Sequence, residues 1–182
     1  EKLSESSMPF IFKGGTSLLL LLQELRRLSI DIDIIVPKSV KIAEINEILK
    51  NIVRTSSFTR YEEQERHLSQ IPKAHFKLFY ESPFNQSEVY VLLDVLFEEN
   101  PYSRLDSTDI VCPFIDTIPP NVTVKVPSIA DILGDKLTAF APNTTGILYD
   151  KEKEMEIIKQ LFDIESLFDQ LSTTNGVKDT FI

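Results

Sequence analysis

One acidic residue stands in the middle of the most apolar segment of this sequence. Residues 89–97 read Val-Tyr-Val-Leu-Leu-Asp-Val-Leu-Phe, and Asp94 is the only charged residue among them. A segment rich in β-branched and aromatic residues predicts a buried strand, and we expect this one to be central in its sheet. A buried carboxylate is costly unless a cation or a metal ion faces it. Asp94 therefore predicts a metal site or, alternatively, a buried Arg or Lys partner.

Two further acids lie on another predicted strand. Between residues 30 and 36, Asp31 and Asp33 alternate with isoleucines, and this period of two is typical of a strand. Their side chains leave the same face about 6.6 Å apart along the chain, and carboxylates this close repel each other unless a cation lies between them. Taken alone, the short motif is more typical of an exposed edge strand. If this strand neighbours residues 88–97, however, Asp94 reaches the same point.

Three converging carboxylates are suited to a hard divalent cation. Mg²⁺ prefers oxygen ligands and commonly completes its shell with substrate phosphates. The candidate metal ligands are Asp31, Asp33 and Asp94. We expect Mg²⁺ at this site, with Mn²⁺ as the alternative ion.

A glycine pair precedes these acids. Residues 14–17, Gly-Gly-Thr-Ser, join the apolar stretch 8–13 to a helix predicted over residues 16–27. Free N–H groups at a helix N-terminus favour phosphate, and glycines allow it to approach closely. A Gly-Gly pair before a helix is by itself more often only a turn, but an Asp-x-Asp strand follows here. The candidate nucleotide-binding residues are Gly14, Gly15, Thr16 and Ser17.

The rest of the chain predicts an α+β fold. Beyond Pro127 the apolar period becomes helical, with Ser128 and Asp131 as a capping pair. We expect a mixed or antiparallel sheet core over residues 1–126 and a C-terminal helical pair packed on it over residues 127–182. The predicted strands cover 57–62, 75–81, 88–97, 109–116 and 122–126. The last helix is predicted over 150–171, with Leu161, Phe162 and Phe168 among its inward-facing side chains.

Charge and cysteine content narrow the classes of protein. A net charge of -9 argues against a surface coated with nucleic-acid-binding residues, although it allows a local basic patch. Cys112 is the only cysteine, which excludes an internal disulfide and fits a cytoplasmic location. The leucine run 18–22 is far shorter than the roughly 20 residues of a membrane span. We therefore expect no membrane partner, and, because the chain begins at Glu1, a trimmed N-terminus.

Together these motifs resemble the signature of the minimal, DNA-polymerase-beta-like nucleotidyltransferases. The string Phe12-Lys-Gly-Gly-Thr-Ser-Leu18, followed by Arg27-x-Ser29-x-Asp31-x-Asp33, resembles the AbiEii/AbiGii branch more closely than its relatives. Its later lysine motif is matched around Lys136, and its final basic-acidic motif is matched by Lys159 to Asp163. The resemblance covers residues 10–36, 88–97 and 127–168.

The resemblance implies an enzyme and a set of partners. Members are toxins of bacterial toxin–antitoxin and abortive-infection (phage-defence) systems, each neutralised by a cognate antitoxin. A nucleoside triphosphate would donate its nucleoside monophosphate to a tRNA end or a protein acceptor, releasing pyrophosphate. By resemblance, Lys136 would also contact the phosphates. The candidate catalytic residues are then Asp31, Asp33, Asp94, Lys136 and Asp163.

Other interpretations remain open at this point. Gln160 stands where the family usually has an acid, which motivates a nucleotide- or partner-binding module whose catalysis has decayed. Lys136 could be a surface helix lysine, and Asp163 a solvated helix acid. A sugar-nucleotide glycosyltransferase also uses Asp-x-Asp, but only after a longer nucleotide-binding half. His67 and His75 have no acidic partner at ligand spacing and are predicted to be ordinary surface or sheet residues.

Overall fold

The computed structural model covers the whole chain and describes all residues except 25, 65–71, 115, 142–145, 150–151 and 182. The strands are β1 (Ile11–Lys13), β2 (Ile32–Val36), β3 (Phe58–Glu63), β4 (Lys73–Glu81), β5 (Glu88–Phe97), β6 (Leu105–Asp109) and β7 (Thr123–Pro127). The helices are α1 (Gly14–Leu21), α2 (Ile42–Thr55), α3 (Ile129–Phe140), α4 (Glu154–Gln170) and α5 (Val177–Thr180).

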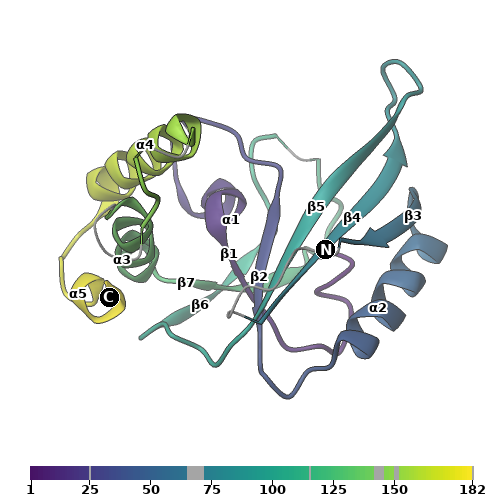
Figure 1. Cartoon of the computed structure of the whole chain (residues 1–182), viewed down its shortest axis with the longest axis horizontal. Helices are drawn as coiled ribbons and strands as arrows, with labels where there is room; N and C mark the ends of the chain where they lie inside the picture. The colour runs from purple at the N-terminus through teal and green to yellow at the C-terminus, as the bar shows by residue number, and fades with distance from the viewer. Residues whose placement is uncertain (25, 65–71, 115, 142–145, 150–151, 182) are drawn as a thin grey trace.

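Five strands form one mixed sheet in the order β1-β2-β5-β4-β3 (Figure 1). β2 and β5 are parallel, and the other neighbouring pairs are antiparallel. β6 and β7 form a separate antiparallel pair. The predicted α+β class with a mixed sheet is confirmed, as is the central place of β5. β5 lies next to β2, which is the condition under which Asp94 was expected to reach the other acids.

One face of the five-stranded sheet is apolar and is covered by α2 (Figure 1). Alternation along the strands places Ile34, Phe76 and Leu93 on this face. They pack with Ile45 and Leu49 of α2, and all five side chains are at most 2% exposed. We call this side the apolar face and the opposite side the polar face. The polar face is therefore free to carry charged residues without opening the main core.

A second core joins the helices at the other end of the molecule. Leu18 of α1, Ile132 and Leu133 of α3, and Leu167 of α4 are buried against one another. The predicted cap of α3 is confirmed, because the Ser128 hydroxyl accepts a hydrogen bond from the backbone N–H of Asp131. None of the described helices combines the length and the apolar character needed to cross a membrane.

Three predicted elements differ from the observed ones. α1 ends at Leu21 and does not continue to residue 27, because a run of leucines has no period that locates a helix end. The strand predicted at 109–116 was placed too late in the sequence, because the observed strand β6 pairs with β7 over Leu105–Asp109. In α4, by contrast, only one stripe can face α3. The inward side chains predicted there are exposed at Leu161 (52%), Phe162 (44%) and Phe168 (49%).

Candidate active site

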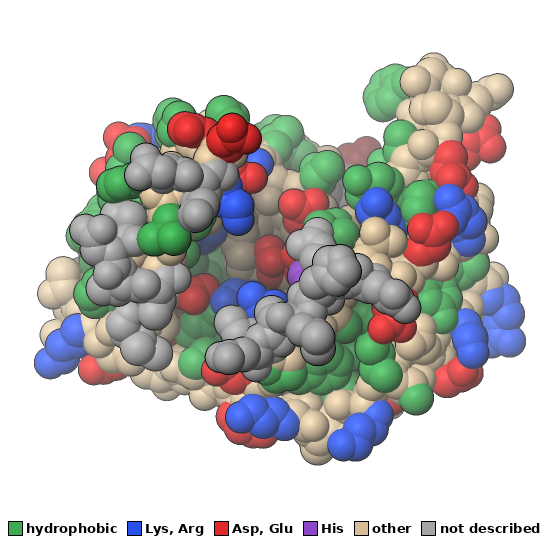
Figure 2. Space-filling model, in the orientation of Figure 1, with side chains coloured by type: hydrophobic (Ala, Val, Ile, Leu, Met, Phe, Trp, Pro, Cys, Tyr) green, Lys and Arg blue, Asp and Glu red, His purple; other side chains and the backbone are tan. Residues whose placement is uncertain are grey.

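The register of four neighbouring strands brings four polar side chains together on the polar face. Asp33 of β2 is paired with Asp94 of β5, and Lys13 of β1 is paired with Asp33. His75 of β4 is paired in turn with Asp94. These residues line a pocket of about 110 Å³. Figure 2 shows the molecule hollowed between the helices and the sheet, with acidic, basic and histidine side chains in the hollow.

Asp33 is held in an unfavourable electrostatic environment. Burial, followed by the charge of Asp94, raises the pKa of Asp33 to about 6, although Lys13 and Lys136 oppose the shift. An acid whose pKa is raised by a second carboxylate lacks a sufficient positive neighbour. The pair of Asp33 and Asp94 is therefore a place where a cation would bind favourably.

Asp94 has a partner that its sequence context did not indicate. His75 Nδ1 lies 2.6 Å from Asp94 Oδ1, and the histidine side chain is only 12% exposed. The predicted alternative of an Arg or Lys partner is thus replaced by a histidine. The predicted place of His75 in a sheet is confirmed. The residue is not an ordinary one, however, because the β4–β5 register gives it an acidic partner that no ligand spacing in the sequence indicates. His67 lies outside the described residues.

Glycine is required at position 14 because of its conformation and its contact with Asp33 on the polar face. Its φ is +76°, a conformation that favours glycine. A Cβ placed there would lie 2.0 Å from Asp33 Oδ2, far inside van der Waals contact. Ser17 supports the same turn by donating a hydrogen bond to the Gly14 carbonyl at 2.8 Å. The glycine loop and the acid strand are thus packed against each other.

Asp31 is placed differently from the other two candidate ligands. It is exposed and precedes β2, and its backbone carbonyl accepts a hydrogen bond from the Thr16 hydroxyl. Within the described ranges, no group of three or more His, Cys, Asp or Glu side chains is arranged to hold a metal ion. Asp33 and Asp94 still fit Mg²⁺ chemically, since this ion is often held by one or two carboxylates together with substrate phosphates. The role of Asp31 stays a prediction.

Lys136 and Asp163 lie together in a buried ionic cluster. Lys136 Nζ is 2.9 Å from Asp163 Oδ2, and the two side chains are 9% and 3% exposed. Arg27 binds the same carboxylate, donating from Nε to Oδ1 at 2.7 Å and from Nη2 to Oδ2 at 2.6 Å. Lys136 and Asp163 are therefore neither surface nor solvated residues. Arg27 appeared in the sequence only as part of the family string, without a role.

Lys13 is a second residue that the sequence did not single out. Its Nζ lies 3.0 Å from Asp135 Oδ2, and Tyr102 donates a hydrogen bond to the same oxygen at 3.4 Å. Burial alone would lower the pKa of Lys13, but Asp135 and Tyr102 outweigh burial and raise it. Lys13 is thus a permanent cation facing Asp33. Its position directly before Gly14 was the available signal.

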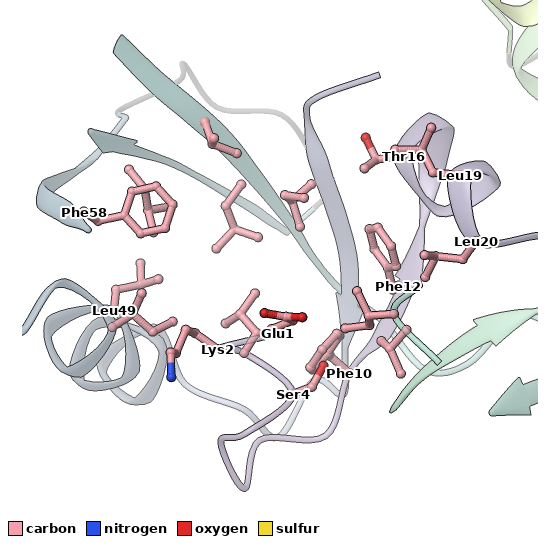
Figure 3. Close-up of a pocket in the computed structure, with 18 residues that line it drawn as sticks. Glu1, Lys2, Ser4, Phe10, Phe12, Thr16, Leu19, Leu20, Leu49 and Phe58 are labelled. Carbon is pink, nitrogen blue, oxygen red and sulfur yellow. The ribbon is translucent and has the colours of Figure 1, made fainter. Parts of the chain in front are cut away.

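A larger cavity lies away from the polar pocket. A space of about 430 Å³ lies at the apolar face, between α1 and α2 (Figure 3). Phe12, Leu20, Leu49 and Phe58 are among its walls, and the carboxylate of Glu1 lies within it. This cavity presents an almost entirely hydrocarbon surface and lacks the convergent charges found around Asp33.

A family of known proteins matches nearly the whole chain. Residues 2–181 match the family described as "Nucleotidyl transferase AbiEii toxin, Type IV TA system". No curated protein sequence matches the chain.

Solved structures share the fold at low sequence identity. MenT4, a nucleotidyltransferase toxin from Mycobacterium tuberculosis, aligns with TM-score 0.62 and 16% identity over 98% of this chain and 58% of its own. JHP933 from Helicobacter pylori aligns with TM-score 0.59 and 19% identity over 93% of this chain and 61% of its own. An antigenic nucleotidyltransferase-like protein from Paracoccidioides brasiliensis aligns with TM-score 0.58 and 14% identity, over 98% and 80% of the two chains.

The chain therefore spans less than two thirds of MenT4 and of JHP933. Its own match to the family nevertheless extends over nearly every residue, including the glycine loop, the acid strands and the Lys136–Asp163 cluster. The chain belongs to the AbiEii family of nucleotidyltransferase toxins.

Proposed function

We propose that this protein transfers a nucleoside monophosphate from a nucleoside triphosphate to an RNA or protein acceptor, in a reaction that depends on Mg²⁺. The observation that carries the proposal is the cross-strand pair of Asp33 and Asp94 beside the Gly14 loop. Two carboxylates and a glycine turn at a helix N-terminus provide the two requirements of the reaction, a grip on a cation and a cradle for phosphate.

Each group has a distinct role in the proposed reaction. Asp33, with Asp94 and the flanking Asp31, would hold Mg²⁺, which when bound offsets phosphate charge. Residues 14–17 would cradle the triphosphate, with Lys136 supplying a positive charge. The acceptor oxygen attacks the α-phosphorus, the bond from that phosphorus to the bridging oxygen breaks, and pyrophosphate leaves. Asp94 would accept the proton of the attacking hydroxyl.

The biological setting is proposed from the family alone. As a member of a Type IV toxin–antitoxin family, the protein would act in the cytoplasm and be countered by a cognate antitoxin. A role in defence against phage is part of the same proposal. These proposals refer to toxins as long as JHP933 and MenT4, of which this chain spans less than two thirds.

A transfer assay tests the proposal. The purified protein is incubated with each α-³²P-labelled nucleoside triphosphate, Mg²⁺ and total tRNA, alongside an Asp33→Asn, Asp94→Asn double variant. We expect label to appear on RNA or protein with the wild type only, and the labelled species identifies the acceptor. Triphosphate binding by a folded wild type without transfer of any label would instead favour the decayed binding module that Gln160 suggests.

A further inference from the structure

We propose that Arg27 binds the phosphates of the nucleotide, and that Asp163 is the positioning residue that holds Arg27 and Lys136 in place. The inference rests on the proposed function and deepens it, because it assigns the triphosphate grip to specific side chains. Two cations, Arg27 and Lys136, share the single carboxylate of Asp163, so these three side chains carry a net charge of +1.

This excess charge faces the glycine loop. A Cβ on Gly15 would lie 2.7 Å from Arg27 Nη2 and 3.0 Å from Ser29 Oγ. The guanidinium and the Ser29 hydroxyl therefore lie directly against Gly15, in the first turn of α1, where backbone N–H groups have no partner within the helix. Cationic, hydroxyl and N–H donors thus converge on one place beside the loop.

The cluster also reaches the acid pair. Lys136 lies close enough to Asp33 that its charge opposes the raised pKa of that acid. Lys136 therefore links Asp163 to the proposed cation site, and Arg27 places the second cation of the same cluster against Gly15. A triphosphate lying from Asp33 across the loop would meet both cations in turn.

Arg27 retains the donors that such a contact needs. A guanidinium carries five N–H donors. Asp163 accepts from Nε and one hydrogen of Nη2, and the Leu28 carbonyl accepts one hydrogen of Nη1 at 3.4 Å, so one hydrogen on each of Nη1 and Nη2 is left. The bidentate contact fixes the plane of the group, so that its remaining donors are held in place before the ligand binds. Asp163 is 3% exposed and itself faces the cations. Positioning is thus the role that its contacts support, and the proton transfer at the acceptor is left to Asp94.

Arg26 provides a matched control within the same segment. It also bridges to α4, with Nη1 2.5 Å from Glu165 Oε1 and Nη2 2.6 Å from Asp169 Oδ2. Its cluster holds one cation and two carboxylates, so its net charge is negative, and its side chain is 38% exposed. Adjacent arginines with the same helix as partner therefore differ in the sign of the cluster that they form.

Calorimetric binding of inorganic tripolyphosphate, and separately of nucleoside triphosphate, with Mg²⁺ tests the inference. We expect Arg27→Gln to weaken binding by about tenfold, as for the loss of a charge-assisted hydrogen bond. Arg26→Gln should change it by less than about twofold on the same scale. In the transfer assay, Arg27→Gln should raise KM by a similar factor with little change in kcat, because phosphate binding is shared by the ground and transition states.

Asp163→Asn should change phosphate affinity in opposite directions for a positioning role and for a purely electrostatic role of the carboxylate. Removing a negative charge near phosphate would tighten binding if the carboxylate acted only through its charge. We expect weaker binding, because both cations lose their anchor. If Asp163→Asn or Arg27→Gln does not fold, as judged by circular dichroism, Arg27→Lys serves instead, since it keeps the charge but lacks the planar fork. Weaker binding by Arg27→Lys is expected.

The inference is overturned if Arg27→Gln, or Arg27→Lys in its place, binds both ligands as tightly as Arg26→Gln, or if Asp163→Asn binds them more tightly than the wild type. In either case a wild type that binds triphosphate leaves the proposed function intact. A folded wild type that binds neither ligand would overturn both the inference and the proposed function.

Discussion

The two faces of the five-stranded sheet are built from the same strands, but one face packs into the main core and the other carries charged side chains. Leu93 and Asp94 are consecutive in β5, yet Leu93 is 2% exposed in the main core, whereas Asp94 faces Asp33 and His75. The apolar face gains stability from burial. The polar face holds two carboxylates, and burial, followed by the charge of Asp94, raises the pKa of Asp33. Because side chains alternate along a strand, the same segment can stabilise the fold on one face and hold two mutually repelling carboxylates on the other.

The largest expected effect is the loss of transfer activity when a carboxylate of the polar face is removed. Asp94→Asn should lower the rate of nucleotidyl transfer at least a thousandfold, equivalent to ~4 kcal/mol of lost transition-state stabilisation. The melting temperature should stay equal or rise, because repulsion with Asp33 is relieved. Asp109→Asn, at an exposed position of β6, is the control and should leave the rate unchanged. Equal rates for the two variants would remove Asp94 from the reaction.

Truncating the preceding residue, on the apolar face, should have the converse effect: a loss of stability without a loss of activity. Leu93→Ala should lower the free energy of unfolding by about 3 kcal/mol, from the lost burial and the cavity left behind. Urea denaturation followed by circular dichroism measures the loss. The transfer rate per folded molecule should stay within about twofold of the wild type. Leu93 lies on the opposite face from Asp94, so its removal should leave the activation free energy of the transfer almost unchanged. A large fall in that rate would show that the two faces are coupled.

The pH dependence of stability sharpens the comparison. Because the pKa of Asp33 is raised to about 6 in the folded state, the folded state binds more protons than the unfolded state between about pH 4 and 6. Stability contributed by this group is therefore present at low pH and lost as pH rises through 6. Without divalent cations, Asp33→Asn should be more stable than the wild type by about 3 kcal/mol at pH 7.5. The difference should shrink towards pH 4, as thermal melts would show, and a constant difference would contradict the assigned cause.

The smallest effect concerns the histidine that orients Asp94. His75→Phe keeps an aromatic ring but removes the hydrogen bond to Asp94, and should lower kcat by about tenfold, as for loss of an orienting partner near a metal site. His75→Asn retains a donor and should recover most of the rate. If the Asn variant is as slow as the Phe variant, the hydrogen bond is not what matters at this position.

Much of this arrangement was predictable because it depends on local pattern. The alternation of Asp31 and Asp33 with isoleucines located β2, and the apolar context of Asp94 located the central strand. Strand adjacency then implied that Asp33 and Asp94 meet, as the register confirms. Gly14 could be selected only together with the Asp-x-Asp strand that follows it, because a Gly-Gly pair before a helix is by itself more often only a turn.

The remaining contacts depend on long-range packing that no local pattern encodes. His75 and Asp94 are 19 residues apart and meet through strand register, while Arg27 and Asp163 are 136 residues apart and meet only when α4 packs beside α1. The α4 stripe was also unpredictable, since apolar residues occur on several sides of that helix and only the position of α3 decides which are buried.

We predict that the polar face holds a divalent cation together with a nucleotide. Electron paramagnetic resonance of Mn²⁺, with a non-hydrolysable nucleoside triphosphate analogue, measures this directly on the wild type and on the Asp33→Asn, Asp94→Asn double variant. We predict nucleotide-dependent Mn²⁺ binding by the wild type and its loss in the folded double variant. Equal Mn²⁺ binding by both proteins would place the cation elsewhere and contradict the assignment of this face as the active site.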